Sequence, residues 1–235
     1  MSVLLGIDTS STDLGIGVWD DQGPVAACSR FLKNSHAESV AAAVSTTLAS
    51  GGFGPTAVTH VAIACGPGSF TGLRIGIAFI KGFCLDAAIG VLPLSSLFIL
   101  AHGGIATDGP VVAAIDARRD EVFWARFLAA PSGLSRVKED CRTGAGEFAS
   151  ALQPGDTIIT DTLGYGRSSV FDFLKNRPRV FPVDRYPVQR GLHCAAAGAR
   201  ALAHGEADGS SWQEASAVLP RYHRDFAPPA AGQNR

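Results

Sequence analysis

The sequence predicts an α/β protein of two lobes, in which the second lobe is a reduced version of the first. Short apolar runs near the N-terminus are separated by turn-forming residues and then give way to alternating helical and strand-like segments. A second series of apolar runs begins near residue 111, after the turn-forming stretch Thr107–Pro110. A chain of 235 residues with 46% hydrophobic residues can form two modest cores, because domains commonly contain about 100 to 150 residues.

The first lobe is expected to begin with three antiparallel strands, because turn chemistry separates the apolar runs Val3–Asp8, Leu14–Trp19 and Val25–Phe31. A helix capped by Ser35 and Glu38 follows and ends near Gly51. Then come a strand, a helix, a strand and a helix, at Val58–Ala64, Thr71–Leu85, Ile89–Leu92 and Ser95–His102. This order is that of the ribonuclease-H-like lobe, which actin-like ATPases contain twice.

The second lobe repeats the start of this order, with apolar runs at Val111–Asp116, Glu121–Leu128 and Leu134–Val137. Shorter helical and strand segments follow, near Gly144–Leu152, Thr157–Thr160 and Arg167–Lys175. We therefore expect an actin-like ATPase (ribonuclease-H-like) fold with an N-terminal lobe at residues 1–108 and a reduced C-terminal lobe at residues 109–218. The tail at residues 219–235 contains paired prolines among small and polar residues, so it is expected to be partly disordered.

The composition argues against several classes of protein. With 20 Lys and Arg against 21 Asp and Glu, the chain has no strong field to attract nucleic acid or an acidic membrane. Its five scattered cysteines form no Cys-x-x-Cys pair, so neither a disulfide framework nor a zinc site is indicated. No basic leader and no apolar run of about 20 residues are present, so we expect a soluble, cytoplasmic protein that makes no membrane contact.

The glycine-rich segment Gly66–Gly76 follows a predicted strand and opens a predicted helix. Such a loop can hold a phosphate, because glycines let backbone N–H groups approach an anion at a helix N-terminus. The lysine and hydroxyl residue of a Walker motif are missing, and Phe70 would crowd a phosphate. The favoured interpretation is a tight turn, in which Gly68 is free to take a positive φ and Ser69 or Thr71 caps the helix.

Two predicted hairpin turns, at Asp8–Ser10 and Asp116–Arg119, occupy the places of the phosphate-binding turns of actin-like ATPases. Each lacks the glycine that usually stands two residues after the aspartate, so a Cβ blocks the approach of a phosphate. We interpret them as parts of a vestigial nucleotide site, although Asp8 and Thr9 could still touch a nucleotide. The residues assigned to this vestigial site are Asp8, Thr9, Ser10, Gly66, Gly68 and Asp116.

The predicted helix Thr71–Leu85 has apolar side chains around its whole circumference. One face must pack on the parent sheet, so another face is available for a second protein or for the other lobe of this chain. The alanine-rich first helix could extend the same surface. The predicted partner interface consists of His36, Val40, Val44, Leu73, Ile77, Ile80 and Lys81.

Several of these segments together resemble the TsaB (YeaZ) family, and Gly66–Gly76 is the most specific of them. The other matching segments are Ile7–Ser10, Ser35-His36, Ile115–Val122 and Pro220-x-Tyr222-x-Arg224, where His223 replaces the family's usual aliphatic residue. The resemblance implies a non-catalytic scaffold or dimerisation subunit. Its complex transfers threonylcarbamoyl to N6 of adenosine 37 in tRNAs that read codons starting with A.

The resemblance also implies the partners and cofactors. The chain would bind and activate the catalytic paralogue TsaD, help to dock the ATPase TsaE, form a homodimer when alone, and meet tRNA only through the complex. No cofactor of its own is expected, whereas ATP or ADP and a metal are expected on the partner subunits. The paralogue's two metal-binding histidines align with Ser96 and Leu100, which cannot hold that metal.

Two enzymatic alternatives remain open. A small actin-like-fold ATPase or kinase would need a working nucleotide site between the lobes. A glycoprotease-type peptidase would need Ser69 as nucleophile, but Pro67 and Thr71 stand where the Gly-x-Ser-x-Gly elbow has glycines.

Overall fold

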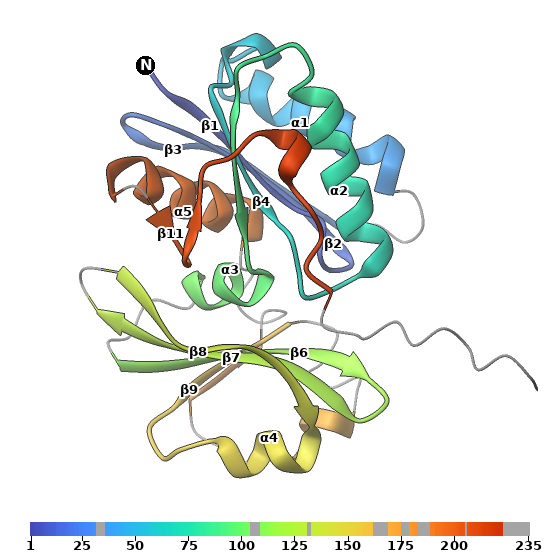
Figure 1. Cartoon of the computed structure of the whole chain (residues 1–235), viewed down its shortest axis with the longest axis vertical. Helices are drawn as coiled ribbons and strands as arrows, with labels where there is room; N and C mark the ends of the chain where they lie inside the picture. Colours follow the sequence, from blue (N-terminus) through green and yellow to red (C-terminus); the bar gives the residue numbers. More distant parts are fainter. Residues whose placement is uncertain are drawn as a thin grey trace, which may run out of the picture.

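The computed structural model describes residues 1–31, 36–103, 109–130, 133–161, 169–174, 179–182, 189–204 and 206–222. Its framework consists of two five-stranded sheets, one above the other in Figure 1. Each sheet begins with an antiparallel meander to which parallel strands are added. This arrangement confirms the predicted α/β, actin-like fold class, with a second lobe poorer in helices.

The first sheet has the strand order β3-β2-β1-β4-β5. Its strands are β1 (Val3–Asp8), β2 (Asp13–Asp20), β3 (Gly23–Phe31), β4 (His60–Ala64) and β5 (Gly90–Leu94). The intervening helices are α1 (His36–Ser50), the short η1 (Pro55–Ala57), α2 (Phe70–Phe83) and α3 (Ser96–His102). The predicted order of this lobe is confirmed, because turn residues separate the first strands and serine side chains cap α2 and α3; the Ser95 hydroxyl, for example, accepts from Leu97 N and Phe98 N. The predicted cap of the first helix at Ser35 lies outside the described residues.

The second sheet has the strand order β10-β9-β6-β7-β8. Its strands are β6 (Gly109–Arg118), β7 (Glu121–Ala130), β8 (Gly133–Gly144), β9 (Thr157–Thr160) and β10 (Val180–Pro182). Helix α4 (Ala145–Ala151) and the 3-10 segment η2 (Ser169–Leu174) cover its outer face, with Phe148 and Phe171 fully buried between them and the sheet. The edge strand β8 is longer than the predicted apolar run, since it continues in polar residues along β7.

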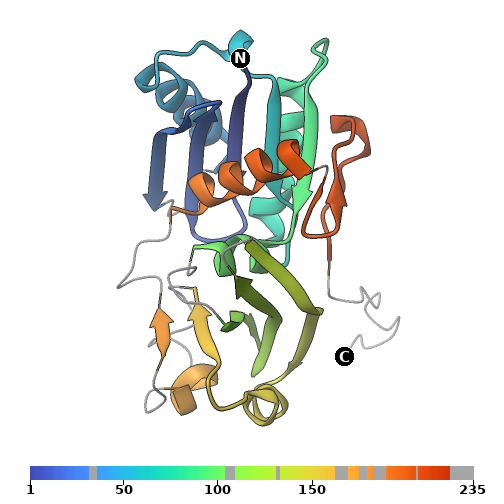
Figure 2. The ribbon, with the colours of Figure 1, turned by 90° about the vertical axis from the view of Figure 1, so that its left-hand side faces the viewer.

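The chain leaves the second lobe and returns to the first, which differs from the predicted division at residues 109–218. Helix α5 (Arg190–His204) packs across β1 and β2, and Figure 2 shows it crossing the strands of the first sheet. The last elements, β11 (Glu206–Ala207), β12 (Ser210–Ser211) and η3 (Ala215–Ala217), also lie on the first lobe. Gln213 and Val91 exchange two backbone hydrogen bonds there, of 2.8 and 2.9 Å. The C-terminal lobe therefore comprises residues 109–182, and residues 190–222 complete the first lobe.

Glycines allow α5 to lie directly on the backbone of the sheet. A Cβ on Gly17 would stand 2.5 Å from Leu192 N, and a Cβ on Gly15 would stand 2.6 Å from Gly191 N. A side chain at either strand position would push the helix away. The return of the chain thus depends on glycines that are far from α5 in the sequence.

One hydrophobic core is shared by the two lobes. Helices α3 and α5 lie between the sheets, and their side chains join strand residues of both lobes in a single cluster. Leu4 and Leu92 enter it from the first sheet, and Val111 and Phe127 from the second. Opening the lobes would expose this apolar surface, so the two lobes behave as one packed body. Within the described ranges, no helix is long and apolar enough to cross a membrane.

Candidate functional site

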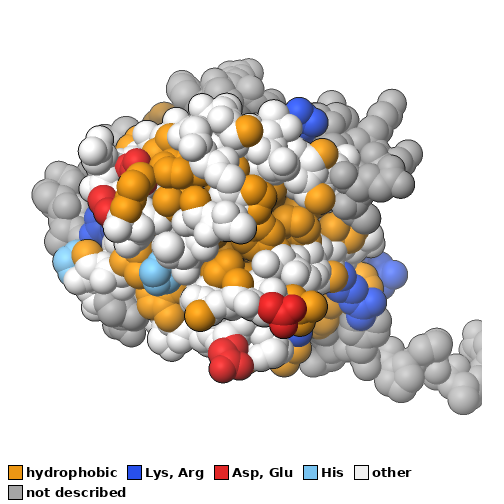
Figure 3. Space-filling view, turned by 90° about the horizontal axis from the view of Figure 1, so that it is seen from above, with side chains coloured by type: hydrophobic (Ala, Val, Ile, Leu, Met, Phe, Trp, Pro, Cys, Tyr) orange, Lys and Arg blue, Asp and Glu red, His pale blue; other side chains and the backbone are white. Residues whose placement is uncertain are grey.

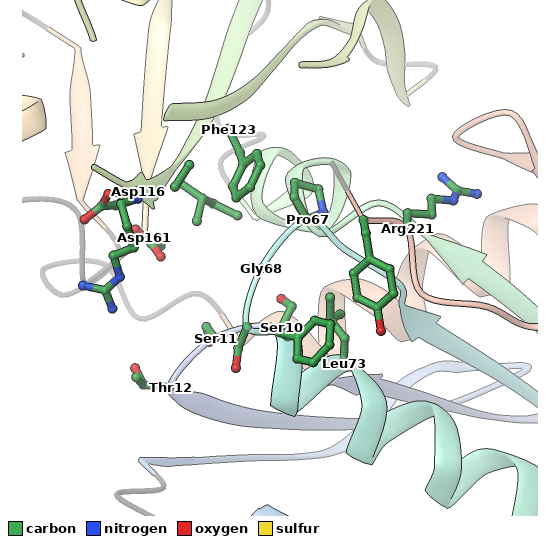
Figure 4. Close-up of a pocket in the computed structure, with 16 residues that line it drawn as sticks. Ser10, Ser11, Thr12, Pro67, Gly68, Leu73, Asp116, Phe123, Asp161 and Arg221 are labelled. Atoms are coloured by element: carbon green, nitrogen blue, oxygen red, sulfur yellow. Dashed lines mark hydrogen bonds between the residues drawn. The ribbon is translucent and has the colours of Figure 1, made fainter. Parts of the chain in front are cut away.

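A cavity of about 390 Å³ lies between the lobes, where the predicted phosphate turns meet (Figure 4). The β1–β2 turn and the loop before α2 form one wall, and the β6–β7 hairpin forms the other. The C-terminal segment passes the mouth with Arg221 and Tyr222. Of the predicted vestigial site, Ser10, Gly68 and Asp116 line the cavity, whereas Asp8, Thr9 and Gly66 are not among its lining residues. The structure adds Phe123, Asp161 and Arg221, which the sequence did not single out, and Tyr222, which it singled out only through the family resemblance.

The carboxylate of Asp8 is committed to contacts inside the chain. One oxygen accepts from Ser10 N at 2.7 Å and from the Ser10 hydroxyl at 2.6 Å. The other accepts from Arg190 Nε at 2.7 Å, and the two charged side chains are 0% and 6% exposed. Arg190 also donates to the Ser10 hydroxyl at 3.0 Å. Asp8 cannot turn toward a metal-bound phosphate without leaving this arginine buried and unpaired.

The glycines of Gly66–Gly76 meet protein atoms and leave no room there for a phosphate. Ser69 N donates to Ser10 O at 2.7 Å, and the Ser69 hydroxyl caps α2 by accepting from Gly72 N at 3.2 Å. A Cβ on Gly68 would stand 2.9 Å from the Ser10 Cβ, and Gly72 and Gly76 lie against Thr9. Gly68 has φ of 157°, near the limit of the region that favours glycine. These contacts support the interpretation of a tight strand-to-helix turn packed on the first hairpin.

The β6–β7 turn presents arginines instead of glycine. Asp116 accepts from Arg118 N at 2.7 Å, which folds the turn back on the carboxylate. Arg118, Arg119 and Asp120 have φ of 67°, 55° and 63°, a left-handed run without a glycine. Arg118 lines the cavity, and Arg118 and Arg119 are both exposed.

An aromatic wall stands at the mouth of the cavity. The rings of Phe70 and Tyr222 lie 5.1 Å apart, and the Arg74 guanidinium lies 3.8 Å from the centre of the Phe70 ring. Arg74 Nε also donates to the Tyr222 hydroxyl at 3.0 Å. The C-terminal segment is held by Arg221 N, which donates to Cys65 O at 2.7 Å, so this wall has a fixed place.

The predicted partner interface is largely buried inside the chain, and this part of the prediction is wrong. Val40, Val44, Leu73, Ile77 and Ile80 are at most 5% exposed. Four of them belong to the core cluster that α1 and α2 form with the first sheet, and Leu73 is buried beside the cavity between the lobes. When a helix is apolar on all sides, its sequence does not show which face packs against its own sheet. In this structure the larger aliphatic side chains lie on the packed face.

The remaining two predicted interface residues are not buried in this way. Lys81 is half-buried and donates to Ser216 O at 3.2 Å. His36 begins α1, and its side chain lies outside the described residues.

The outer face of α1 and α2 carries small, mostly uncharged side chains, and the second lobe does not cover it. Among the exposed side chains that the structure describes on this face, Arg74 is the only charged one, and Ile75, Phe79 and Phe83 are half-buried beside them. Figure 3, which looks onto the first-lobe end of the molecule, shows hydrophobic side chains in a broad band across this end. We call the exposed set the small-residue face; its members are Ala41, Ala42, Ser45, Thr46, Ala49, Thr71, Arg74, Ala78 and Gly82.

The positions that align with the paralogue's metal ligands lie in the shared core. Ser96 and Leu100 are both fully buried on α3. In the part of the chain that the structure describes, no group of three His, Cys, Asp or Glu side chains could hold a metal ion. The described residues thus offer no metal centre beside the cavity.

These features define the class: an actin-like fold whose phosphate-binding turns are filled by the chain's own side chains. The family model described as TsaD: tRNA N6-adenosine threonylcarbamoyltransferase matches residues 30–175. The tRNA threonylcarbamoyladenosine biosynthesis protein TsaB of Escherichia coli is 35% identical over 138 residues, 58% of this chain and 59% of that protein. The protein of the same name from Bacillus subtilis is 30% identical over 156 residues, 66% of this chain and 68% of its own length.

Solved structures agree with the sequence matches. YeaZ from Pseudomonas aeruginosa superposes with a TM-score of 0.77 and 26% identity, over 94% of this chain and 100% of that one. An activator of 2-hydroxyisocaproyl-CoA dehydratase from Clostridium difficile, with bound ADPNP, has a TM-score of 0.52 and 10% identity, over 86% of this chain and 96% of that one. That second likeness concerns the fold alone. The chain belongs to the TsaB (YeaZ) family, and the aligned part spans 59% of the E. coli protein.

Proposed function

We propose that this chain is a non-catalytic subunit of the complex that forms threonylcarbamoyladenosine in tRNA. It binds a TsaD-like catalytic paralogue, holds it in an active arrangement, and helps to dock a TsaE-like ATPase. ATP or ADP and the metal belong to these partners, and tRNA meets this chain through the complex. The names of the relatives in tRNA threonylcarbamoyladenosine biosynthesis support this assignment, and they favour a cytoplasmic location.

The observation that carries the proposal is the small-residue face. Alanine, serine, threonine and glycine let two helix pairs approach closely, and an almost uncharged surface loses little hydration when a partner covers it. A rigid scaffold acts on a partner by binding one of its conformations more tightly than the others. The core shared between the lobes supplies that rigidity.

The contacts around the cavity support a role in which this chain catalyses no reaction itself. Asp8 is paired with Arg190, and the glycine-rich segment Gly66–Gly76 is packed on Thr9 and Ser10. At the first phosphate turn a magnesium nucleotide therefore finds no free carboxylate to hold its metal, because Asp8 bonds Ser10 and Arg190. We expect no magnesium-dependent ATP hydrolysis by the isolated chain.

Reconstitution of tRNA modification tests the proposal. A TsaD-like protein, a TsaE-like protein, tRNA, ATP and a threonylcarbamoyl donor are combined with the wild-type chain, with no chain, or with Ala42→Glu. Ala203→Glu is the matched control, because Ala203 is an exposed alanine on α5, away from the small-residue face. We expect modification with the wild type and the control, and a strong loss in the other two reactions. Equal modification with and without the chain would contradict the proposal.

A further inference from the structure

We propose that the partner covering the small-residue face presents a carboxylate, from an Asp or Glu side chain, to the guanidinium of Arg74. This inference rests on the proposed function and names the chemistry that the TsaD-like partner must supply. Three features carry it. Arg74 is the one charged side chain among the exposed ones described on this face, its guanidinium is held in place, and small residues lie beside it.

The charge of Arg74 has no counter-charge on this face. Among the exposed side chains described on α1 and α2 there is no carboxylate, and none of the ion pairs in the described part of the chain includes Arg74. A partner that covers this guanidinium without an anion leaves a charge out of water and unpaired, which is strongly unfavourable. The face therefore favours a partner with an acidic group at this point.

The guanidinium is held in place by the chain itself. Its central carbon lies 3.8 Å from the centre of the Phe70 ring, and its Nε donates to the Tyr222 hydroxyl at 3.0 Å. The segment that carries Tyr222 is fixed in turn, because Arg221 N donates to Cys65 O at 2.7 Å. An arginine that is already ordered loses little side-chain entropy when it pairs, and its two terminal nitrogens match the two oxygens of a carboxylate.

Small residues continue the row of exposed side chains to which Arg74 belongs. Residues four apart lie on the same face of a helix, and Arg74, Ala78 and Gly82 are all exposed on α2. Ala78 and Gly82 project little from the helix, so a partner helix can come close beside the guanidinium. A side chain as short as Asp or Glu can then reach Arg74 from that helix.

A second copy of this chain fits the same face less well. It brings another Arg74 and, among the exposed side chains described on this face, no carboxylate to meet the first. A protein can reject a wrong partner through a charge that this partner leaves unpaired. Arg74 therefore favours an acidic partner over self-association through this face.

Calorimetric titration of a TsaD-like protein with the full chain tests the inference. Arg74→Met removes the charge but keeps an apolar side chain against Phe70, and it should weaken the complex about thirtyfold or more, as loss of one member of a covered ion pair does. Arg74→Lys keeps the charge without the planar fork, so its affinity should lie between those of the wild type and Arg74→Met. The matched control is Lys138→Met, since Lys138 is an exposed cation 4.7 Å from the centre of the Trp124 ring on the second lobe. This control should bind like the wild type.

Exchange of the two charges identifies the carboxylate. Arg74→Glu should weaken the complex further than Arg74→Met, because it sets two like charges against each other. Exposed Asp and Glu residues of the TsaD-like protein are then changed to Lys one at a time, and one of these variants should bind Arg74→Glu more tightly than it binds the wild-type chain. Wild-type affinity of Arg74→Met, or failure of every Lys variant to restore binding of Arg74→Glu, would overturn the inference.

The same titrations separate this inference from the proposed function. Binding that is weakened by Ala42→Glu but not by Arg74→Met would keep the face as the interface and contradict the carboxylate alone, whereas no binding by the wild-type chain would contradict both. The thermal unfolding midpoint of each variant is measured alongside and should match that of the wild type, because Arg74 is exposed. Sedimentation of the chain alone adds one more outcome. Self-association that weakens in Arg74→Met as much as the complex does would assign the anion to a second copy and overturn the proposal.

Discussion

Replacing Arg190 by methionine should show that Asp8 has a structural role. Methionine keeps much of the arginine stem but removes the guanidinium that bonds Asp8 at 2.7 Å and Ser10 at 3.0 Å. Because both charged side chains are almost fully buried, the variant leaves a carboxylate without its counter-charge. Breaking such a pair from one side costs about 3 to 5 kcal/mol of the free energy of unfolding.

Urea unfolding at pH 7, followed by circular dichroism, measures this loss. The control is Arg142→Met, since Arg142 and Glu121 form a pair at 3.6 Å with side chains about one third exposed, and its loss costs about 0 to 1 kcal/mol. Asp8→Asn together with Arg190→Met should cost less than the sum of the single changes, because the unpaired charge is gone. A loss for Arg190→Met no larger than that of the control would refute the reasoning.

Three further results are expected. Gly17→Ala places a Cβ 2.5 Å from Leu192 N and should cost about 1 to 3 kcal/mol in urea unfolding, whereas Gly144→Ala, with open space around it, should cost far less. Burial, with His193 and Arg200 nearby, lowers the pKa of His102 to about 4. The folded protein therefore favours the neutral ring, and a fall in pH below the ordinary pKa of about 6.5 lowers the free energy of unfolding. Between pH 7 and pH 5 this free energy should fall by about 2 kcal/mol more for the wild type than for His102→Leu. A difference between the two proteins that does not change with pH would contradict this. The purified chain should hydrolyse no ATP above background with magnesium, and a rate that disappears in Asp8→Ala would count against a non-catalytic role.

The order of elements could be predicted because its signals are local. Turn residues separate β1, β2 and β3, and Ser95 caps α3 through contacts within three residues. Strand β9 was predicted with the bounds that the structure shows, because its apolar run lies between polar neighbours.

Helix α5 could not be predicted in the same way. Its alanine-rich sequence is only weakly apolar, and it is stabilised by packing on the glycines of β1 and β2. Those glycines look like weak strand residues until the helix is placed on them. Because α5 was not predicted, the segment from residue 190 to residue 218 was wrongly assigned to the C-terminal lobe.

The candidate site was predicted in part. The sequence identified the β1–β2 turn, the glycine-rich loop and the β6–β7 turn as the places of phosphate-binding turns, and Ser10, Gly68 and Asp116 from these three segments line the cavity. The partner of Asp8 was missed, because Arg190 is 182 residues away and carries no motif. The buried side chains Val44 and Ile77 were assigned to the interface because hydrophobicity alone does not show which face of a helix its own sheet occupies.

The central claim, that the small-residue face binds a partner, is tested most directly by titrating a TsaD-like protein with the wild-type chain, Ala42→Glu and Ala203→Glu in a calorimeter. A buried, unpaired carboxylate at residue 42 should weaken the complex at least about tenfold, since such a group costs about 1 to 3 kcal/mol or more. The Ala203→Glu chain should bind like the wild type. Equal affinity of all three chains, or no binding by any of them, would contradict the account.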